Sequence, residues 1–265
     1  SAVCNEAVKL AKRHKFAQLS GFVNGVLRNI ARNIDSVQFD SLSIRYSMPQ
    51  WIVDRFVSAY GEKKAEEIFK AFHNKSTISI RTNLTRCTPD ELRAMLEAEG
   101  VTVTAVDELD YAFVISGFDY LNGLQSFRDG LFYVQDISSM LVAQTAAPKK
   151  GDYVIDVCAA PGGKSTHIAE LLQGSGHVLA RDLTDNKVDM IEENIDRHGL
   201  KNMSAEVWDA TVPDADSAGK ADILICDLPC SGLGVLGRKK DIRYKMTPES
   251  VDELAALQRQ ILDTV

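Results

Sequence analysis

The stretch Tyr153–Thr166 reads Y-V-I-D-V-C-A-A-P-G-G-K-S-T and decides the fold. It opens with a short apolar run typical of a buried strand, and apolar residues at helical spacing follow from Lys164 or Ser165. Between the two lie small residues, which let a backbone approach a ligand closely. The stretch therefore predicts a strand, a tight turn and a helix, with a ligand crevice at the carboxyl end of the strand.

Three classes of ligand suit such a turn. A dinucleotide site needs G-x-G-x-x-G, which this stretch lacks. A phosphate-binding loop needs G-x-x-x-x-G-K-[ST]; Gly163, Lys164 and Ser165 fit this pattern, but Cys158 stands at the position of the first glycine. The third class is S-adenosylmethionine, which needs small residues and acidic hydrogen-bond acceptors. Residues further along the chain decide between the three.

Length and composition indicate a globular protein. The chain has 265 residues, of which 45% are hydrophobic, enough for two domains or one large one. Its first residues are too charged for a signal peptide, and no run is long enough to span a bilayer, so we expect no membrane and a cytoplasmic location. Five cysteines are an odd number at low density, which fits reduced thiols.

Charge is distributed unevenly along the chain. The formal net charge is −7, which alone argues against a nucleic-acid partner. Residues 1–33 nevertheless carry six lysines and arginines and one acid, Glu6. This segment is either a basic arm that holds a phosphate backbone or a solvated helix face, and both interpretations stay open. The basic residues are Lys9, Lys12, Arg13, Lys15, Arg28 and Arg32.

The first half of the chain predicts helices followed by a small α+β unit. Residues 2–34 have helical spacing broken near Ser20, which predicts two helices without a complete core of their own. After a linker over 35–47, turn residues and periodicity predict an accessory domain. Its expected helices are 51–60, 62–72 and 89–99, and its expected strands are 78–82, 101–106 and 112–115.

The second half alternates strands and helices, the pattern of a doubly wound parallel sheet. We expect an extended segment at 132–134, a helix at 137–145 behind Asp136, strands at 153–157, 177–180, 204–207 and 223–225, and helices at 165–172, 187–197 and 248–264. The fold class predicted is α/β, with a Rossmann-like domain, a smaller α+β domain and an N-terminal helical remnant.

Acidic residues follow successive strands of the predicted sheet. Asp182 ends the second strand, where a carboxylate can accept hydrogen bonds from ribose hydroxyls, and Asp209 ends the third, within reach of an adenine amino group. Either residue alone also fits a helix cap or a turn. The fourth strand leads into D-L-P-C-S-G, which places Cys230 near Asp227. A thiol beside a carboxylate suggests addition to carbon 6 of a pyrimidine; zinc is the weaker use, because Cys226 and Cys230 have no partner pair.

D-V-C-A-A-P-G-G-K-S-T together with D-L-P-C-S-G-L-G resembles the Sun family of RNA cytosine-5 methyltransferases. The resemblance implies S-adenosyl-L-methionine as cofactor, with Asp182 at the ribose, Asp209 near the adenine, and Asp227 between the methionine end and the target base. It also implies a cofactor loop, referred to below by that name, made of Cys158, Ala159, Ala160, Pro161, Gly162, Gly163 and Lys164.

The resemblance extends to the N-terminal half. A-V-K-L-A-K-R-H-K and G-F-V-N-G-V-L-R-N are similar to the last helices of a NusB-like RNA-binding domain, which implies bacterial members that act on small-subunit ribosomal RNA. The implied domains are residues 1–40, the end of the NusB-like domain; 41–128, an accessory RNA-binding domain; and 129–265, a C-terminally incomplete methyltransferase domain. Arg81 and Asn83 resemble an RNA-side signature, and five basic residues after the site are expected to hold phosphates: Arg238, Lys239, Lys240, Arg243 and Lys245.

The resemblance also implies an absence. Family members have two cysteines, and the one that attacks the base lies in a Thr-Cys context on a later strand, beyond Val265. Cys230 is then the cysteine that assists product release. Leu228 and Lys240 depart from the family pattern in tolerable ways. We expect a monomer that binds RNA; the alternatives are a P-loop-like nucleotide hydrolase and a non-catalytic RNA-binding module.

Overall fold

The computed structural model describes residues 2–74 and 77–265, and it divides into two compact units, Ser1–His73 and Asn74–Val265. The division does not coincide with the domain boundaries expected from the sequence, because residues 41–73 belong to the first unit. The boundaries 1–40, 41–128 and 129–265 therefore stay a prediction. Among the described residues, no helix is long and apolar enough to cross a bilayer.

The first unit is helical. Its helices are α1 (Ala2–Arg13), α2 (Ser20–Asn33), α3 (Leu42–Arg45), α4 (Gln50–Tyr60) and α5 (Glu62–Ala71), with short 3₁₀ turns at Ala17–Leu19 and Ile34–Ser36. Helices α4 and α5 share a buried core in which Ile52, Ala65 and Phe69 are fully covered. By contrast, α2 buries no side chain, and its Phe22 is 71% exposed. The prediction that the first two helices lack a complete core is confirmed.

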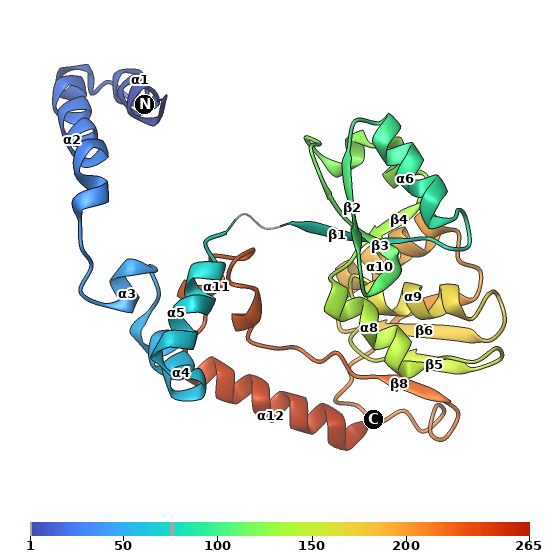
Figure 1. Cartoon of the computed structure of the whole chain (residues 1–265). Helices are drawn as coiled ribbons and strands as arrows, with labels where there is room; N and C mark the ends of the chain where they lie inside the picture. The colour runs from blue at the N-terminus through green and yellow to red at the C-terminus, as the bar shows by residue number, and fades with distance from the viewer. Residues whose placement is uncertain (1, 75–76) are drawn as a thin grey trace. The chain divides into compact units, whose positions relative to one another are not determined.

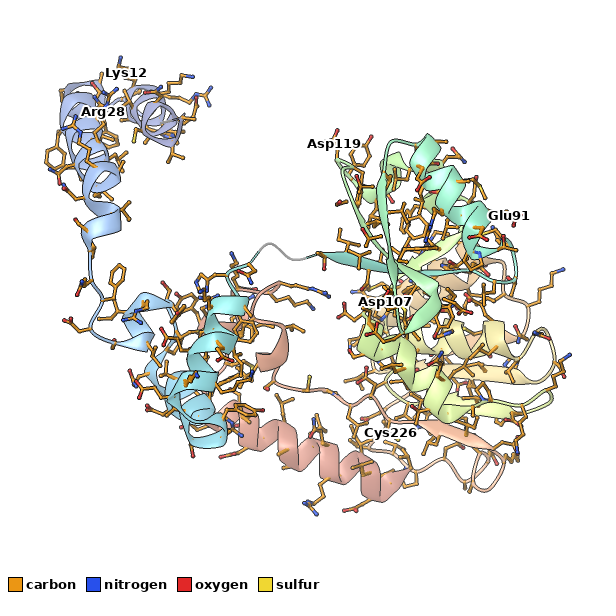
Figure 2. The ribbon with its side chains drawn as sticks, in the orientation of Figure 1. Lys12, Arg28, Glu91, Asp107, Asp119 and Cys226 are labelled. Carbon is orange, nitrogen blue, oxygen red and sulfur yellow. The ribbon has the colours of Figure 1, made fainter. Side chains whose placement is uncertain are left out.

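The basic side chains of the first unit are exposed. Lys12 lies on α1 and Arg28 on α2 (Figure 2), and the other four lysines and arginines of residues 1–33 are exposed as well. Lys9 pairs with Glu6 at 2.6 Å on the surface. The structure thus leaves these cations accessible to solvent or to a phosphate backbone.

The second unit begins with a four-stranded antiparallel sheet in the order β2-β3-β1-β4, in which β1 is teal and the other strands are green in Figure 1. Its strands are β1 (Ile78–Thr82), β2 (Thr102–Val106), β3 (Leu109–Ser116) and β4 (Phe132–Val134). Helix α6 (Pro89–Ala98) packs on one face, where Ile80, Leu92 and Phe132 are fully buried. Because side chains alternate along a strand, Arg81 points to the opposite face.

Strand β4 belongs to this accessory sheet rather than to the parallel one. The sequence analysis placed residues 132–134 in the domain starting at 129, but Tyr133 pairs with Arg81 of β1. A 3₁₀ turn at Leu121–Gly123 and helix α7 (Gln125–Arg128) lead into β4, and α8 (Ile137–Ala146) follows it. Pairing between strands some fifty residues apart leaves no local signal in the sequence, so periodicity alone could not assign residues 132–134 to this sheet.

The Rossmann-like part is a parallel sheet in the order β7-β6-β5-β8. Its strands are β5 (Tyr153–Asp156), β6 (His177–Asp182), β7 (Met203–Val207) and β8 (Ile223–Ile225), and its helices are α9 (Gly163–Leu171), α10 (Asp185–His198), α11 (Ile242–Lys245) and α12 (Pro248–Thr264), with a 3₁₀ turn at Leu233–Val235. From β5 the chain continues to β6, which pairs with one side of β5, whereas β8 pairs with the other side. The crevice between the loops after β5 and β8 is therefore a topological switch point, where open α/β sheets bind ligands.

Alternate residues of the central strand bury opposite faces of the parallel sheet. Val154 packs with Ile168 of α9 and Ile191 of α10 on one face. Ile155 and Val157 pack with Ile261 of α12 on the other. Covering both faces with helices makes a parallel sheet stable, and the predicted doubly wound α/β fold is confirmed.

Candidate active site

The cofactor loop is held by its own backbone hydrogen bonds. The N–H of Ala159 donates to the carbonyl of Arg181 at 2.8 Å, and the N–H of Gly162 donates to the carbonyl of Ala159 at 2.6 Å. Gly162 has a φ of 99°, a left-handed conformation that a glycine adopts without strain, and it caps α9. The loop after β5 is therefore tied to the end of the neighbouring strand β6.

Asp182 lies at the end of β6 and is 4% exposed. Its Oδ2 accepts the N–H of Ala160 at 2.9 Å, while its Oδ1 accepts the N–H of Leu183 and the ammonium of Lys187, both at 2.8 Å. These donors fix the carboxylate against the cofactor loop. The structure thus brings Asp182 and the loop together, as the sequence predicted.

Asp156, which the sequence analysis did not single out, ends β5 directly beneath the cofactor loop. It is 1% exposed and accepts a hydrogen bond from Ser165 Oγ at 2.6 Å and one from the N–H of Cys158 at 3.4 Å. Burial raises the pKa of this carboxyl group to about 6, although the bonds from Ser165 and Cys158 oppose the shift. In the sequence, its position at a strand end, immediately before the small residues of the loop, could have identified Asp156 as a site residue.

Asp156 makes stability depend on pH. The folded state holds its proton more tightly than the unfolded chain does, so ionisation destabilises the fold as pH rises from about 4 through about 6, by about 3 kcal/mol in all. Asp156→Asn does not titrate, so the difference in unfolding free energy, variant minus wild type, should rise over this window. Urea unfolding of both proteins at a series of pH values measures it. A difference independent of pH would contradict the assignment.

Asp227 follows β8 and faces the cofactor loop across the crevice. Lys164 Nζ lies 2.5 Å from Asp227 Oδ2, and the aspartate side chain is 58% exposed. The carbonyl of Pro229 accepts a hydrogen bond from Gln258 of α12 at 2.7 Å, which anchors the D-L-P-C segment. The ion pair therefore links the two loops at the switch point and leaves the carboxylate accessible.

The three cysteines near the site differ in environment. Cys158 is half-buried, and burial together with Asp182 and Asp156 raises the pKa of its thiol to about 11. Burial, assisted by Asp156, also raises the pKa of Cys226, which lies just after β8 (Figure 2). Both thiols stay protonated at neutral pH and are poor nucleophiles. Cys230 is exposed, so it is the cysteine of this group that a substrate can reach.

Asp209 lies at the surface after β7. Thr211 donates to Asp209 Oδ1 from its N–H at 2.9 Å and from its hydroxyl at 2.7 Å, and the hydroxyl bond is the main cause of a lowered pKa for this carboxyl group. This closed turn keeps the carboxylate ionised at neutral pH. Strand β7 is the neighbour of β6 in the sheet. The loop that carries Asp209 therefore follows the strand next to the one that ends in Asp182.

The expectation that Arg81 and Asn83 form an RNA-facing signature is wrong. Arg81 is 1% exposed and Asn83 is fully buried. Arg81 forms a salt bridge with Glu170 of α9 and donates to Thr166 Oγ1 at 3.1 Å. Asn83 Nδ2 donates to the carbonyl of Gly130 at 2.9 Å and to that of His198 of α10 at 3.3 Å. Both residues join the accessory sheet to the Rossmann-like part, so neither can contact a phosphate.

The basic cluster after the site is only partly available. Arg243 is 4% exposed, and its Nε donates to the carbonyl of Lys240 at 3.0 Å, so its expected role as a phosphate contact is wrong. Arg238 forms an ion pair with Asp136, and Lys245 pairs with Asp241 at 2.6 Å. Lys239 and Lys240 are exposed. A residue buried inside a charged run carries no sequence mark that separates it from its exposed neighbours.

Two residues of the accessory sheet that the sequence analysis missed touch the cofactor loop. The hydroxyl of Tyr133 donates to the carbonyl of Pro161 at 3.0 Å, and Gln135 Nε2 donates to the carbonyl of Gly163 at 3.0 Å. Both side chains are buried. No local pattern distinguishes them from ordinary core residues.

A parallel sheet of this order, with a small-residue loop after its central strand and a carboxylate after each of the next strands, is the arrangement of S-adenosylmethionine-dependent methyltransferases of Rossmann-like fold. Three family profiles match the chain: 16S rRNA methyltransferase RsmB/F at residues 143–265, the RsmF/B-like ferredoxin-like domain at 48–118, and the NusB family at 1–32.

Known proteins agree with these matches. The chain is 37% identical over 269 residues to the probable ribosomal RNA small subunit methyltransferase B of Bacillus subtilis, covering 98% of this chain and 60% of the relative. It is 33% identical to the corresponding Synechocystis protein, covering 100% of this chain and 61% of the relative. The chain therefore belongs to the RsmB/F, or Sun, family of methyltransferases, and it spans about 60% of the length of these relatives.

Solved structures share the fold. The crystal structure of PH0851 superimposes with a TM-score of 0.81 at 26% identity, covering 94% of this chain and 58% of that one. NSun6 from Pyrococcus horikoshii, solved with SFG, gives a TM-score of 0.70 at 20% identity over 82% of this chain and 79% of that one. The second likeness concerns the fold alone.

Proposed function

We propose that this chain belongs to an enzyme that transfers a methyl group to carbon 5 of a cytosine in RNA, most simply in small-subunit ribosomal RNA as the relatives' names indicate. One observation carries the proposal. Asp182 and Asp227 flank a loop of small residues at the switch point, and the exposed Cys230 follows Asp227 by three residues in the same loop. Carboxylates suit ribose and base hydrogen bonds, and an accessible thiol suits pyrimidine addition chemistry.

A phosphate-binding loop fits the geometry poorly. Three N–H groups that would cradle a phosphate, those of Ala159, Ala160 and Gly162, already donate to protein oxygens. Three carboxylates, Asp156, Asp182 and Asp227, are each bonded to a residue of the loop or of the first turn of α9 and would repel a phosphate. These contacts favour a cationic, non-phosphate ligand over a nucleotide triphosphate.

The residues of the site fit S-adenosyl-L-methionine. The cofactor loop offers small residues, Asp182 would accept hydrogen bonds from ribose hydroxyls, and Asp209 would accept one from the adenine amino group. Lys164 and Asp227 would border the methionine end and the target base. When bound, the cofactor supplies an electrophilic methyl group on its sulfonium.

The chain's own groups then act on the base. Asp227 hydrogen-bonds the pyrimidine ring of a cytosine displaced from its stack, and so stabilises the adduct formed when a thiolate adds to carbon 6. That addition makes carbon 5 nucleophilic. After methyl transfer, loss of the carbon 5 proton and elimination of the thiolate restore the aromatic ring. By family resemblance the attacking thiolate belongs to a second cysteine in a Thr-Cys context, and Cys230 assists release.

RNA contacts come from several surfaces. The exposed cations of α1 and α2, and the exposed Lys239 and Lys240, are suited to phosphates. We propose that residues 1–40 end a NusB-like domain, that 41–128 form an accessory domain, and that 129–265 carry the methyltransferase part. A purely RNA-binding module remains the second candidate, because it needs these surfaces and no turnover.

The cofactor assignment is tested on Asp182. Asp182→Ala removes the ribose acceptors and unties the N–H of Ala160, so we expect S-adenosylmethionine to bind about 10- to 100-fold more weakly. Calorimetric titration in EDTA measures the dissociation constant. Asp182→Asn keeps a side chain of the same shape, and it should bind with intermediate affinity.

Asp185→Ala is the matched control, because this residue is also acidic, lies three positions later and is exposed on α10. Its dissociation constant should equal that of the wild type. If Asp182→Ala also bound as tightly as the wild type, the ribose assignment would be wrong. Binding of magnesium ATP, abolished in Lys164→Ala, would instead support the nucleotide hydrolase.

A further inference from the structure

The cofactor loop has two sides, and the structure shows what holds each of them. On the β6 side, Asp182 and the carbonyl of Arg181 accept the loop's N–H groups. On the other side, the carbonyls of Pro161 and Gly163 accept hydrogen bonds from side chains of the accessory sheet. The second set of contacts is made by Tyr133 and Gln135, which lie outside the Rossmann-like part.

Gln135 connects the accessory sheet to the loop. Its Oε1 accepts a hydrogen bond from Arg81 Nε at 2.8 Å, and its Nε2 donates to the carbonyl of Gly163 at 3.0 Å and to that of Ser139 at 3.3 Å. Its backbone is fixed as well, since its carbonyl accepts from Ser79 Oγ at 2.7 Å. With 6% exposure, this amide has one orientation that satisfies all its partners.

Tyr133 supports the adjacent residue of the loop. Its hydroxyl donates to the carbonyl of Pro161 at 3.0 Å, and Asn194 of α10 donates to the same carbonyl at 2.9 Å. The ring lies so close that a Cβ atom on Gly163 would be 3.2 Å from Tyr133 Cε1. The loop is thus packed and hydrogen-bonded against β4 and the residue that follows it.

We propose that Gln135 and Tyr133 are positioning residues for the cofactor site, and that the accessory sheet thereby sets the affinity for S-adenosylmethionine. This inference rests on the proposed cofactor role of the loop. A loop that is already ordered binds its ligand without a further entropic cost, whereas a loop released from its support must be ordered on binding. The accessory sheet is then part of the cofactor site.

The test compares Gln135→Met with Thr82→Val. The first variant removes the bond to Gly163 and should weaken S-adenosylmethionine binding about tenfold. The second removes an equally buried hydrogen bond of the same sheet, from Thr82 Oγ1 to the carbonyl of Tyr111 at 2.8 Å, without touching the loop. It should lower the melting temperature and leave the dissociation constant unchanged. Calorimetry and thermal unfolding give both quantities.

Two further variants separate positioning from general stability. Gln135→Glu keeps an acceptor for Arg81 but cannot donate to Gly163, so it should bind as weakly as Gln135→Met. Tyr133→Phe removes one hydroxyl alone and should fold, with weaker cofactor binding and, in a turnover assay, a raised KM for cofactor but not for RNA.

The outcomes are distinct. Wild-type affinity in Gln135→Met and Tyr133→Phe, while the wild type itself binds, would overturn this inference and leave the proposed function intact. Equal loss of affinity in Thr82→Val would also overturn it, because the effect would then follow stability alone. Failure of the wild type to bind S-adenosylmethionine would overturn the proposed function.

Discussion

Replacing Arg81 by methionine should lower the free energy of unfolding of the unit Asn74–Val265 by about 3–5 kcal/mol. The arginine forms a salt bridge with Glu170, whose side chain is 3% exposed, and donates to Thr166 and Gln135. Methionine has a similar length and no charge, so the variant leaves a carboxylate buried without its cation. The cost arises from that uncompensated charge more than from the lost contacts. Urea unfolding measures it.

Two companion variants identify the cause. Arg81→Met combined with Glu170→Gln removes the buried charge as well, so the double variant should be more stable than Arg81→Met alone. Arg128→Met is the matched control, because Arg128 is exposed and bonds the nearby residues Asn122 and Gln125; it should change stability by less than about 1 kcal/mol. A small effect of Arg81→Met, similar to that of the control, would show that the salt bridge between Arg81 and Glu170 does not stabilise the contact between the accessory sheet and α9.

Asp227→Ala should reduce methyl transfer to RNA by at least about 100-fold. The carboxylate is accessible and is held by Lys164 at 2.5 Å, so it can hydrogen-bond the base as the adduct forms. Asp227→Asn keeps the shape but loses the charge and should be nearly as inactive. The assay follows labelled methyl groups from S-adenosylmethionine into ribosomal RNA, with the protein at its full natural length.

Retention of RNA on a filter separates binding from catalysis in the same variants. We expect Asp227→Ala to retain RNA almost as well as the wild type, because one carboxylate contributes nothing to phosphate binding. Asp216→Ala, an exposed aspartate of the same unit, should have normal activity. An Asp227→Ala variant with half the wild-type rate or more would exclude the role given to this residue.

Much of the fold could be predicted from the sequence, because it depends on local patterns. Alternating and continuous apolar runs located the strands of the parallel sheet within a few residues, and glycines marked helix ends such as Gly61, the C-cap of α4. The carboxylates after β6, β7 and β8 followed directly from those strands. The site was predictable to that extent because strand ends meet at one edge of a parallel sheet.

Long-range pairing could not be predicted in the same way. Arg81 alternates with apolar residues along β1, a pattern typical of a solvated face, yet its partner Glu170 lies 89 residues further on and buries it. The pairing of β4 with β1 also joins segments that are far apart in the sequence. The contacts of Tyr133 and Gln135 with the cofactor loop depend on this pairing and could not be predicted either. Neither composition nor periodicity carries information about which distant segment covers a face.

We propose above that this chain belongs to an enzyme that methylates carbon 5 of a cytosine in RNA. The most direct measurement is nucleoside analysis of ribosomal RNA after incubation with labelled S-adenosylmethionine and the protein at its full natural length. We expect the label to be recovered in 5-methylcytidine, and at least about 100-fold less of it with Asp227→Ala. Label in a different methylated nucleoside, or RNA retention without any label, would contradict it.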